Sequence, residues 1–191
     1  MDKKLVTTFL AVLTCLLACP VAHTQTGRSF PALQAETLDE KTVQLPQATE
    51  GKLAVLALAR SKKAEEHLNT WMKPLYQTFI HEHKNDAWLA PAKEDYDDVR
   101  LFFIPMFSGL NKMAVNRVRK DMRSSVPDQF QQYIMIYQGK TERYEKRLRM
   151  RDKNQPYFFV LDQQGEVTYA TSGSYSERKL SEIEEAIERN R

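Results

Sequence analysis

Cysteine is nearly absent from this sequence. The 191 residues include two cysteines, Cys15 and Cys19, and none follows them. The chain from residue 20 onward therefore has neither a disulfide framework nor a thiolate nucleophile. Thiol–disulfide exchange and thiol-dependent peroxide reduction both require a thiolate, so neither reaction is expected of this part of the chain.

Long hydrophobic runs are also lacking, except at the N-terminus. Residues 5–18 are fourteen uncharged residues behind the charged start Asp2-Lys3-Lys4. That run is short for a bilayer span but typical of a secretory signal, so we expect residues 1–18 to be a signal peptide and the protein to be exported from a bacterium. Residues 16–19 (LLAC) also form a lipobox, which makes Cys19 a candidate lipidated residue. Simple cleavage near residues 22–24 and a retained anchor are the alternatives, so the expected location is the periplasm or a membrane as a lipoprotein.

The remaining residues alternate between apolar runs and amphipathic segments. This order predicts an α/β domain with a mixed sheet, parallel through its βαβ part, with an antiparallel C-terminal β-hairpin and a closing helix. We assign residues 19–29 to a flexible lead and residues 30–191 to the domain. Strands are expected at residues 32–37, 42–45, 53–59, 99–106, 132–137, 157–161 and 167–171, and helices at 62–84, 110–122, 141–148 and 177–188.

Several motifs resemble those of known families. Residues 30–33 (FPAL), 51–56 (GKLAVL) and 155–162 (QPYFFVLD) resemble thioredoxin-like and peroxiredoxin-like exported proteins. A closer resemblance, over residues 30–188, is to the mitochondrial ATP synthase assembly factor family, the ATPase complex subunit ten group. It is carried by Arg60-Ser61 with Ala64-Glu65-Glu66 and Trp71, by Ile104-Pro105-Met106, by residues 122–127 (MRSSVP) and by residues 157–173.

This resemblance implies a thioredoxin-like fold that assembles a membrane complex without redox chemistry and without a cofactor. It also implies that Pro156 matches the proline that is cis in thioredoxin-like families. The chain departs from the assembly family at Pro156, where that family more often has a small residue, and in its bacterial type of signal.

The candidate partner-binding site lies where a thioredoxin carries its Cys-x-x-Cys. There this chain has Arg60, Ser61, Lys62, Lys63 and Glu65, and the fold should bring them near Gln155 and Pro156. A cis bond before Pro156 would leave a backbone group free to pair with a visiting strand. For Ser61, capping of the following helix is favoured over a nucleophilic role, because no G-x-S-x-G context surrounds it.

A second candidate surface is a basic segment, which we call the basic face. We expect it to lie next to a helix that carries five further basic residues, Lys112, Arg117, Arg119, Lys120 and Arg123. It either is a solvated surface or docks phosphate headgroups or an acidic protein. Export argues against nucleic acid as the partner. The basic face comprises Arg143, Lys146, Arg147, Arg149 and Arg151.

No metal site is expected. His81 and His83 are two residues apart, so on a helix they point to different faces. Asp95 and Asp97 have the spacing that opens a calcium loop, but Arg100 stands where that loop needs its glycine.

Two function classes follow from the sequence. The favoured one is a non-catalytic binding or assembly module for a protein client, such as a membrane-complex subunit. The alternative is a thiol oxidoreductase or peroxiredoxin relative with a divergent active site, because fold alone does not specify activity.

Overall fold

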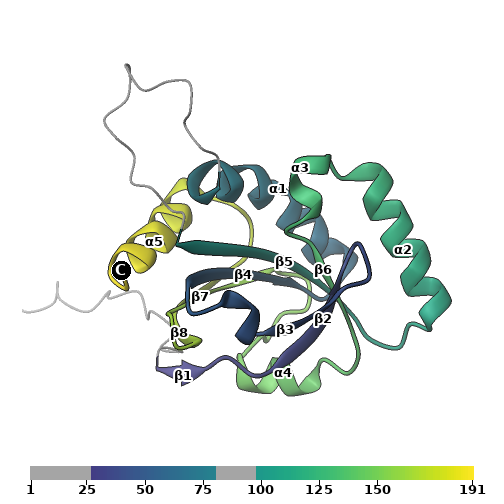
Figure 1. Ribbon diagram of the computed structural model, residues 1–191, viewed down its shortest axis with the longest axis horizontal. Coiled ribbons are helices and arrows are strands. Elements are labelled where there is room, and N and C mark those ends of the chain that lie inside the picture. The colour runs from purple at the N-terminus through teal and green to yellow at the C-terminus, as the bar shows by residue number, and fades with distance from the viewer. Residues whose placement is uncertain (1–26, 81–97) are drawn as a thin grey trace, which may run out of the picture.

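The computed structural model describes residues 27–80 and 98–191 (Figure 1). Its strands are β1 (Arg28–Ser29), β2 (Leu33–Thr37), β3 (Thr42–Leu45), β4 (Leu53–Ala59), β5 (Val99–Phe107), β6 (Met135–Gln138), β7 (Tyr157–Leu161) and β8 (Glu166–Ser172). Its helices are α1 (Lys62–Phe79), α2 (Lys112–Ser125), α3 (Asp128–Gln131), α4 (Glu142–Arg147) and α5 (Glu177–Glu188), with a 3-10 turn at Gln47–Thr49.

The strands of the described ranges form one mixed sheet in the order β1-β8-β7-β4-β5-β6-β2-β3. Strand β4 lies parallel to β5 and antiparallel to β7, and β7 lies antiparallel to β8. The expected α/β class, with a parallel βαβ part and an antiparallel C-terminal hairpin, is confirmed.

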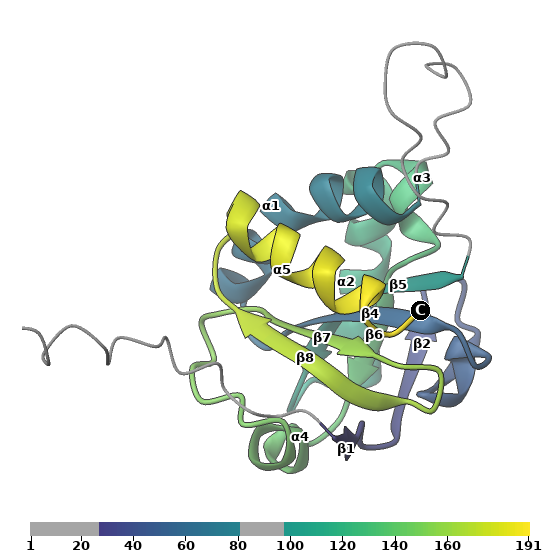
Figure 2. The same ribbon diagram turned by 90° about the vertical axis from the view of Figure 1, so that its left-hand side faces the viewer.

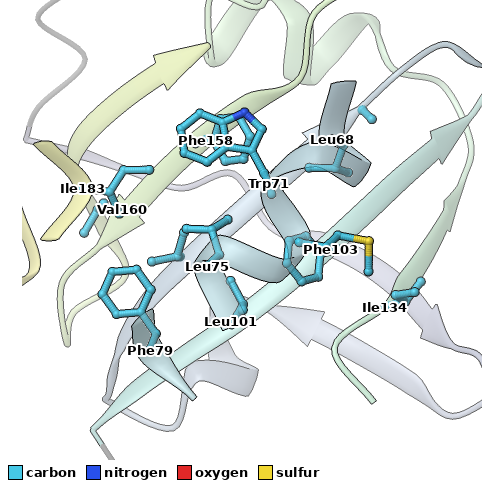
Figure 3. Close-up of a cluster of buried hydrophobic side chains, with 14 of the residues drawn as sticks. Leu68, Trp71, Leu75, Phe79, Leu101, Phe103, Ile134, Phe158, Val160 and Ile183 are labelled. Atoms are coloured by element: carbon cyan, nitrogen blue, oxygen red, sulfur yellow. The ribbon is translucent and has the colours of Figure 1, made fainter. Parts of the chain in front are cut away.

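Helices cover both faces of this sheet. Figure 2 shows α1 and α5 on one side and α4 with β1 on the other. Successive residues of β4 point to opposite faces, so Val55 joins a core with Trp71 and Phe158 (Figure 3), whereas Leu56 joins a second core with Tyr144. The all-apolar composition of β4 is therefore explained by two cores that share one strand.

The β7–β8 turn is specified by Asp162 and Gly165. One carboxylate oxygen of Asp162 accepts hydrogen bonds from the backbone N–H groups of Gln164 and Glu166, both at 2.9 Å. Gly165 has a φ of 78°, and a Cβ atom there would lie 2.7 Å from Cγ of Pro46. Glycine is required at this position both by its left-handed backbone and by the close approach of Pro46.

Several expectations about the elements are wrong in detail. The end of the expected flexible lead forms β1, because Arg28 and Ser29 pair with β8. Helix α2 begins at Lys112 rather than at residue 110 and runs to Ser125, and on it the apolar Met113 is 81% exposed while Arg119 is buried. The sequence pattern also missed α3 and the 3-10 turn, because both are too short to show a periodicity.

Candidate functional site

The first turn of α1 follows directly from the end of β4. Ser61 has an extended backbone, and its Oγ accepts a hydrogen bond from the N–H of Ala64 at 3.1 Å. The expected capping role of Ser61 is thereby confirmed. The same hydroxyl donates to Oδ1 of Asn154 at 3.3 Å, so the start of α1 lies against the segment that leads into β7.

Arg60 turns inward, toward α4. Its Nη1 lies 2.5 Å from Oε1 of Glu145, its Nη2 donates to the carbonyl oxygen of Met150 at 2.6 Å, and its side chain is 7% exposed. Within the described part of the chain its Nε has no hydrogen-bond partner. Arg60 therefore joins the first turn of α1 to α4 and does not itself present a charge to a partner.

Glu145 has a second partner at the start of its own helix. Thr141 occupies the N-cap position of α4 but makes no capping bond, and its hydroxyl instead donates to Oε1 of Glu145 at 2.7 Å. The carboxylate of Glu145 thus contacts both Arg60 and Thr141.

The exposed part of the candidate partner-binding site is smaller than the set named from sequence. Lys62 and Lys63 are exposed, and Glu65 is half-buried. Burial raises the pKa of the Glu65 carboxyl, and the neighbouring charge of Glu66 raises it further, whereas Lys62 lowers it. The accessible charge at this turn is therefore mainly that of the two lysines.

Pro156 differs from the expectation drawn from the thioredoxin resemblance. The one cis peptide bond within residues 27–80 and 98–191 joins Leu45 to Pro46, so the bond between Gln155 and Pro156 is trans. The carbonyl oxygen of Pro156 accepts a hydrogen bond from the N–H of Gly173 at 2.9 Å. The expected cis bond, and the free backbone group inferred from it, are wrong. Pro156 is buried and Gln155 is exposed.

Sequence reasoning missed the loop after β8, which packs against α1. Trp71 of α1 donates its Nε1–H to the carbonyl oxygen of Gly173 at 3.0 Å, and Nδ1 of His67 lies 2.9 Å from Oγ of Ser174. Lys179 donates to the carbonyl oxygens of Ser172 and Ser174 at 2.8 and 3.1 Å. Both Trp71 and Gly173 lie in the motifs that carry the family resemblance, and this was the available signal. The contact between them joins residues 102 positions apart, so no local pattern predicts it.

The five side chains of the basic face are all exposed. Arg143 lies over the ring of Tyr144, 5.6 Å from its centroid, and donates to the carbonyl oxygen of Ala32 at 3.3 Å. In the described residues, Lys146, Arg147, Arg149 and Arg151 have no hydrogen bond or ion pair within the chain. Most of the charge of the basic face is therefore available to an external partner.

The basic residues of α2 do not extend the basic face as the sequence suggested. Arg119 is buried and pairs with Glu36, and Arg123 pairs with Asp39 at 2.9 Å. Val115 of α2 belongs to the core beneath α1, whereas Tyr144 of α4 belongs to the core on the other face of the sheet. Two of the five α2 cations are thus neutralised within the domain.

The residues considered as metal ligands from the sequence are not placed by the structure. His81, His83, Asp95 and Asp97 lie outside the described residues, and Asp98 pairs with Arg191 at 2.8 Å, which holds the pKa of that carboxyl below its ordinary value. The described ranges contain no group of three potential metal ligands. Nor, over these same ranges, is any helix both long enough and apolar enough to cross a bilayer.

Comparison with known sequences identifies one family. The sequence model described as "ATP10 protein" matches residues 21–189, which is most of the chain. No curated protein sequence matches the chain.

Solved structures show the fold. The thioredoxin domain of a thiol-disulfide oxidoreductase from Bacteroides vulgatus superposes with a TM-score of 0.54 at 11% identity, covering 85% of this chain and 97% of that one. BsSco, a member of the Sco family of cytochrome c oxidase assembly proteins, gives 0.53 at 14% identity, covering 84% and 94%. StoA from Bacillus subtilis gives 0.50 at 14% identity, covering 80% and 96%. At these identities the likeness establishes the thioredoxin-like fold alone, as expected.

The inward position of Arg60 generates a stability prediction. Replacing Arg60 with Met should lower the free energy of unfolding by about 2 kcal/mol, because Glu145 and the carbonyl of Met150 lose a buried charged donor. Urea unfolding followed by circular dichroism measures this change. The matched control is Arg147→Met, whose exposed side chain makes no hydrogen bond or ion pair within the described residues, and a change within about 0.5 kcal/mol is expected for it. Equal small changes in both variants would show that the contacts of Arg60 do not stabilise the fold.

Proposed function

Because the chain belongs to the ATP10 protein family of assembly factors, we propose that it is a non-catalytic module that holds a polypeptide client while a membrane complex is assembled. The observation that carries the non-catalytic part is the first turn of α1. A thioredoxin places its reactive cysteines there, and this chain has Arg60, Ser61, Lys62 and Lys63. The hydroxyl of Ser61 is engaged by Ala64 and Asn154.

The fold is compatible with a role in assembly. BsSco, which shares the fold, belongs by its description to a family of cytochrome c oxidase assembly proteins and contains a disulfide switch. The present chain has no cysteine after residue 19, so a disulfide switch of its own is not available to the folded domain. Binding without thiol chemistry is the function that these residues support.

The client surface that we propose is the exposed part of the first turn of α1 with the adjacent Gln155. Lys62 and Lys63 supply two cations on a rigid helix start, which Ser61 caps and Arg60 ties to α4. Charged side chains at such a surface select a partner by attraction and reject others by repulsion. An acidic or carbonyl-rich segment of the client is the chemistry that fits.

We further propose that the protein acts at the cell envelope and is held there through Cys19. The support is the fourteen-residue apolar run, with Leu-Leu-Ala directly before Cys19. Several acyl chains on one terminal cysteine give stable membrane retention, whereas a single chain binds only marginally.

The first prediction concerns catalysis. The purified protein should neither reduce insulin disulfides with a dithiol donor nor consume peroxide, because it offers no thiolate at the first turn of α1. Insulin turbidity and peroxide consumption measure this. Turnover by the pure protein that is lost on replacing Ser61 with Ala would overturn the non-catalytic proposal.

The second prediction concerns client capture. Reversing Lys62 and Lys63 to Glu should lower the yield of co-purified client several-fold while changing the melting temperature little, because exposed charges contribute little to stability. Affinity purification from the protein's own membrane extract, with quantitative mass spectrometry, measures the yield. The matched control reverses Arg117 and Lys120, two exposed cations of α2. If both variants keep the client, the first turn of α1 is not its binding surface.

The third prediction concerns anchoring. The native protein should partition into the detergent phase, and Cys19→Ala should move it to the aqueous phase or block its processing, because the acyl chains have no other attachment point. Phase partition with mass spectrometry of the N-terminus measures this. A mature N-terminus at residue 23 or later would show simple secretion.

A further inference from the structure

We propose that the basic face, together with Arg28 of β1, is the surface of this protein that rests on anionic phospholipid headgroups. This inference deepens the proposed envelope location and rests on the proposed anchor at Cys19. It assigns which side of the domain faces the membrane, which neither the family nor the fold specifies.

The charge of this surface favours an anionic partner. Arg28, Lys153 and the five side chains of the basic face are exposed, and three carboxylates, those of Glu142, Glu145 and Asp152, lie in the same segment. Glu145 is paired with Arg60, so its charge does not offset the basic face. Each basic side chain near an anionic membrane surface increases binding by roughly fivefold, and a cluster of them acts together.

The surface also contains a hollow suited to a phosphate group. Arg28, Arg147 and Leu148 help to line a cavity of about 370 Å³ between β1 and the end of α4. Neither guanidinium has a hydrogen bond or ion pair within the described residues. Guanidinium groups bind phosphate oxygens through two parallel N–H donors, so this pair of arginines matches a phospholipid headgroup.

The start of the domain lies on the same side as the basic face. In both views β1 is beside α4, on the side of the sheet opposite α1 and α5 (Figures 1 and 2). The N–H of Gly27 donates to the carbonyl oxygen of Val167 at 2.9 Å, which holds the beginning of β1 against β8. Gly27 follows Cys19 by eight residues, which span at most about 28 Å when extended. A lipid on Cys19 therefore keeps β1, and with it Arg28 and Arg147, close to the membrane surface.

This orientation brings the proposed client surface near the membrane without burying it. Arg60 joins the first turn of α1 to Glu145 and Met150, and Ser61 of the same turn donates to Asn154, so this turn adjoins the segment that carries the basic face. A membrane-complex subunit that emerges from the bilayer would meet this turn first.

The sequence makes a direct test simple, because no cysteine follows residue 19. Single-cysteine variants Lys146→Cys on the basic face and Lys120→Cys on α2 are made in the full chain, processed by its host, and labelled with a fluorophore. Vesicles of phosphatidylcholine, with or without phosphatidylglycerol, carry a quencher on the lipid headgroup. The processed protein without an introduced cysteine, treated with the same fluorophore, is the control for unspecific labelling.

We expect the quencher to reduce the emission of the label at position 146 several-fold more than that at position 120, and only in vesicles that contain phosphatidylglycerol. Raised salt should weaken the difference, since headgroup contacts are screened. Arg147→Glu with Arg151→Glu should lower affinity for the anionic vesicles at least about tenfold in the unlipidated protein and remove the difference in quenching. Arg117→Glu with Lys120→Glu should leave affinity within about twofold.

Three results would overturn the inference. Equal quenching at the two positions would show that the basic face does not face the lipid, and equal effects of the two charge reversals would show attraction by net charge alone. Loss of client but not of vesicle binding in the Arg147 and Arg151 variant would assign this surface to an acidic protein. If mass spectrometry shows that the host-processed protein carries no lipid on Cys19, and this protein still binds anionic vesicles through the basic face, the inference is supported and the proposed anchor is refuted.

Discussion

Strand β4 is apolar at all seven positions and is buried on both faces of the sheet. A strand of this kind is stable only where each face is covered, because its side chains alternate between the two sides. The rest of the domain meets this constraint with α1 and α5 on one face and with α4, Phe30 and the β2–β3 region on the other. The position of every candidate surface follows from this arrangement.

The candidate client surface begins directly after the buried strand β4. The chain leaves the sheet at Ala59, and within two residues it supplies both a buried cation and a helix cap. Arg60 reaches α4 on one side of the sheet, while Ser61 starts α1 on the other. In thioredoxins the same turn presents a reactive thiol. Here it presents Lys62 and Lys63 on a helix start that Arg60 and Ser61 hold in place, and this geometry is what our proposal of client binding rests on.

The structure also separates two kinds of positive charge that look alike in sequence. On α2, Arg119 and Arg123 form ion pairs with the β2–β3 region, so they hold the domain together. On α4 and the segment after it, most of the arginines have no partner within the described domain, and the nearby Glu145 is turned toward Arg60. This difference is why we propose a membrane surface at α4 and its surroundings rather than at α2. An assembly factor with one side on the membrane and a client surface at the edge of that side is a coherent arrangement for a membrane-complex client.

The sequence by itself determined the elements whose signals are local. The apolar run of residues 53–59, the cap at Ser61 and the hairpin turn at Asp162 and Gly165 depend on neighbouring residues, and each was predictable from them. That no cysteine follows residue 19 is read directly from the sequence. The sequence also carried the family resemblance that the match over residues 21–189 confirms.

Only the tertiary structure decided the features that join distant residues. Arg60 was expected to face a partner and instead meets Glu145, 85 positions away, because a buried guanidinium needs a carboxylate wherever the fold supplies one. On α2 the apolar Met113 is exposed and the charged Arg119 is buried, where Glu36 on β2 accepts its charge. The isomer of each X-Pro bond depends on its packing in the folded domain, so the cis bond lies at Leu45–Pro46 and not at Gln155–Pro156. Such outcomes depend on which surfaces the completed sheet brings together, and no local pattern contains that information.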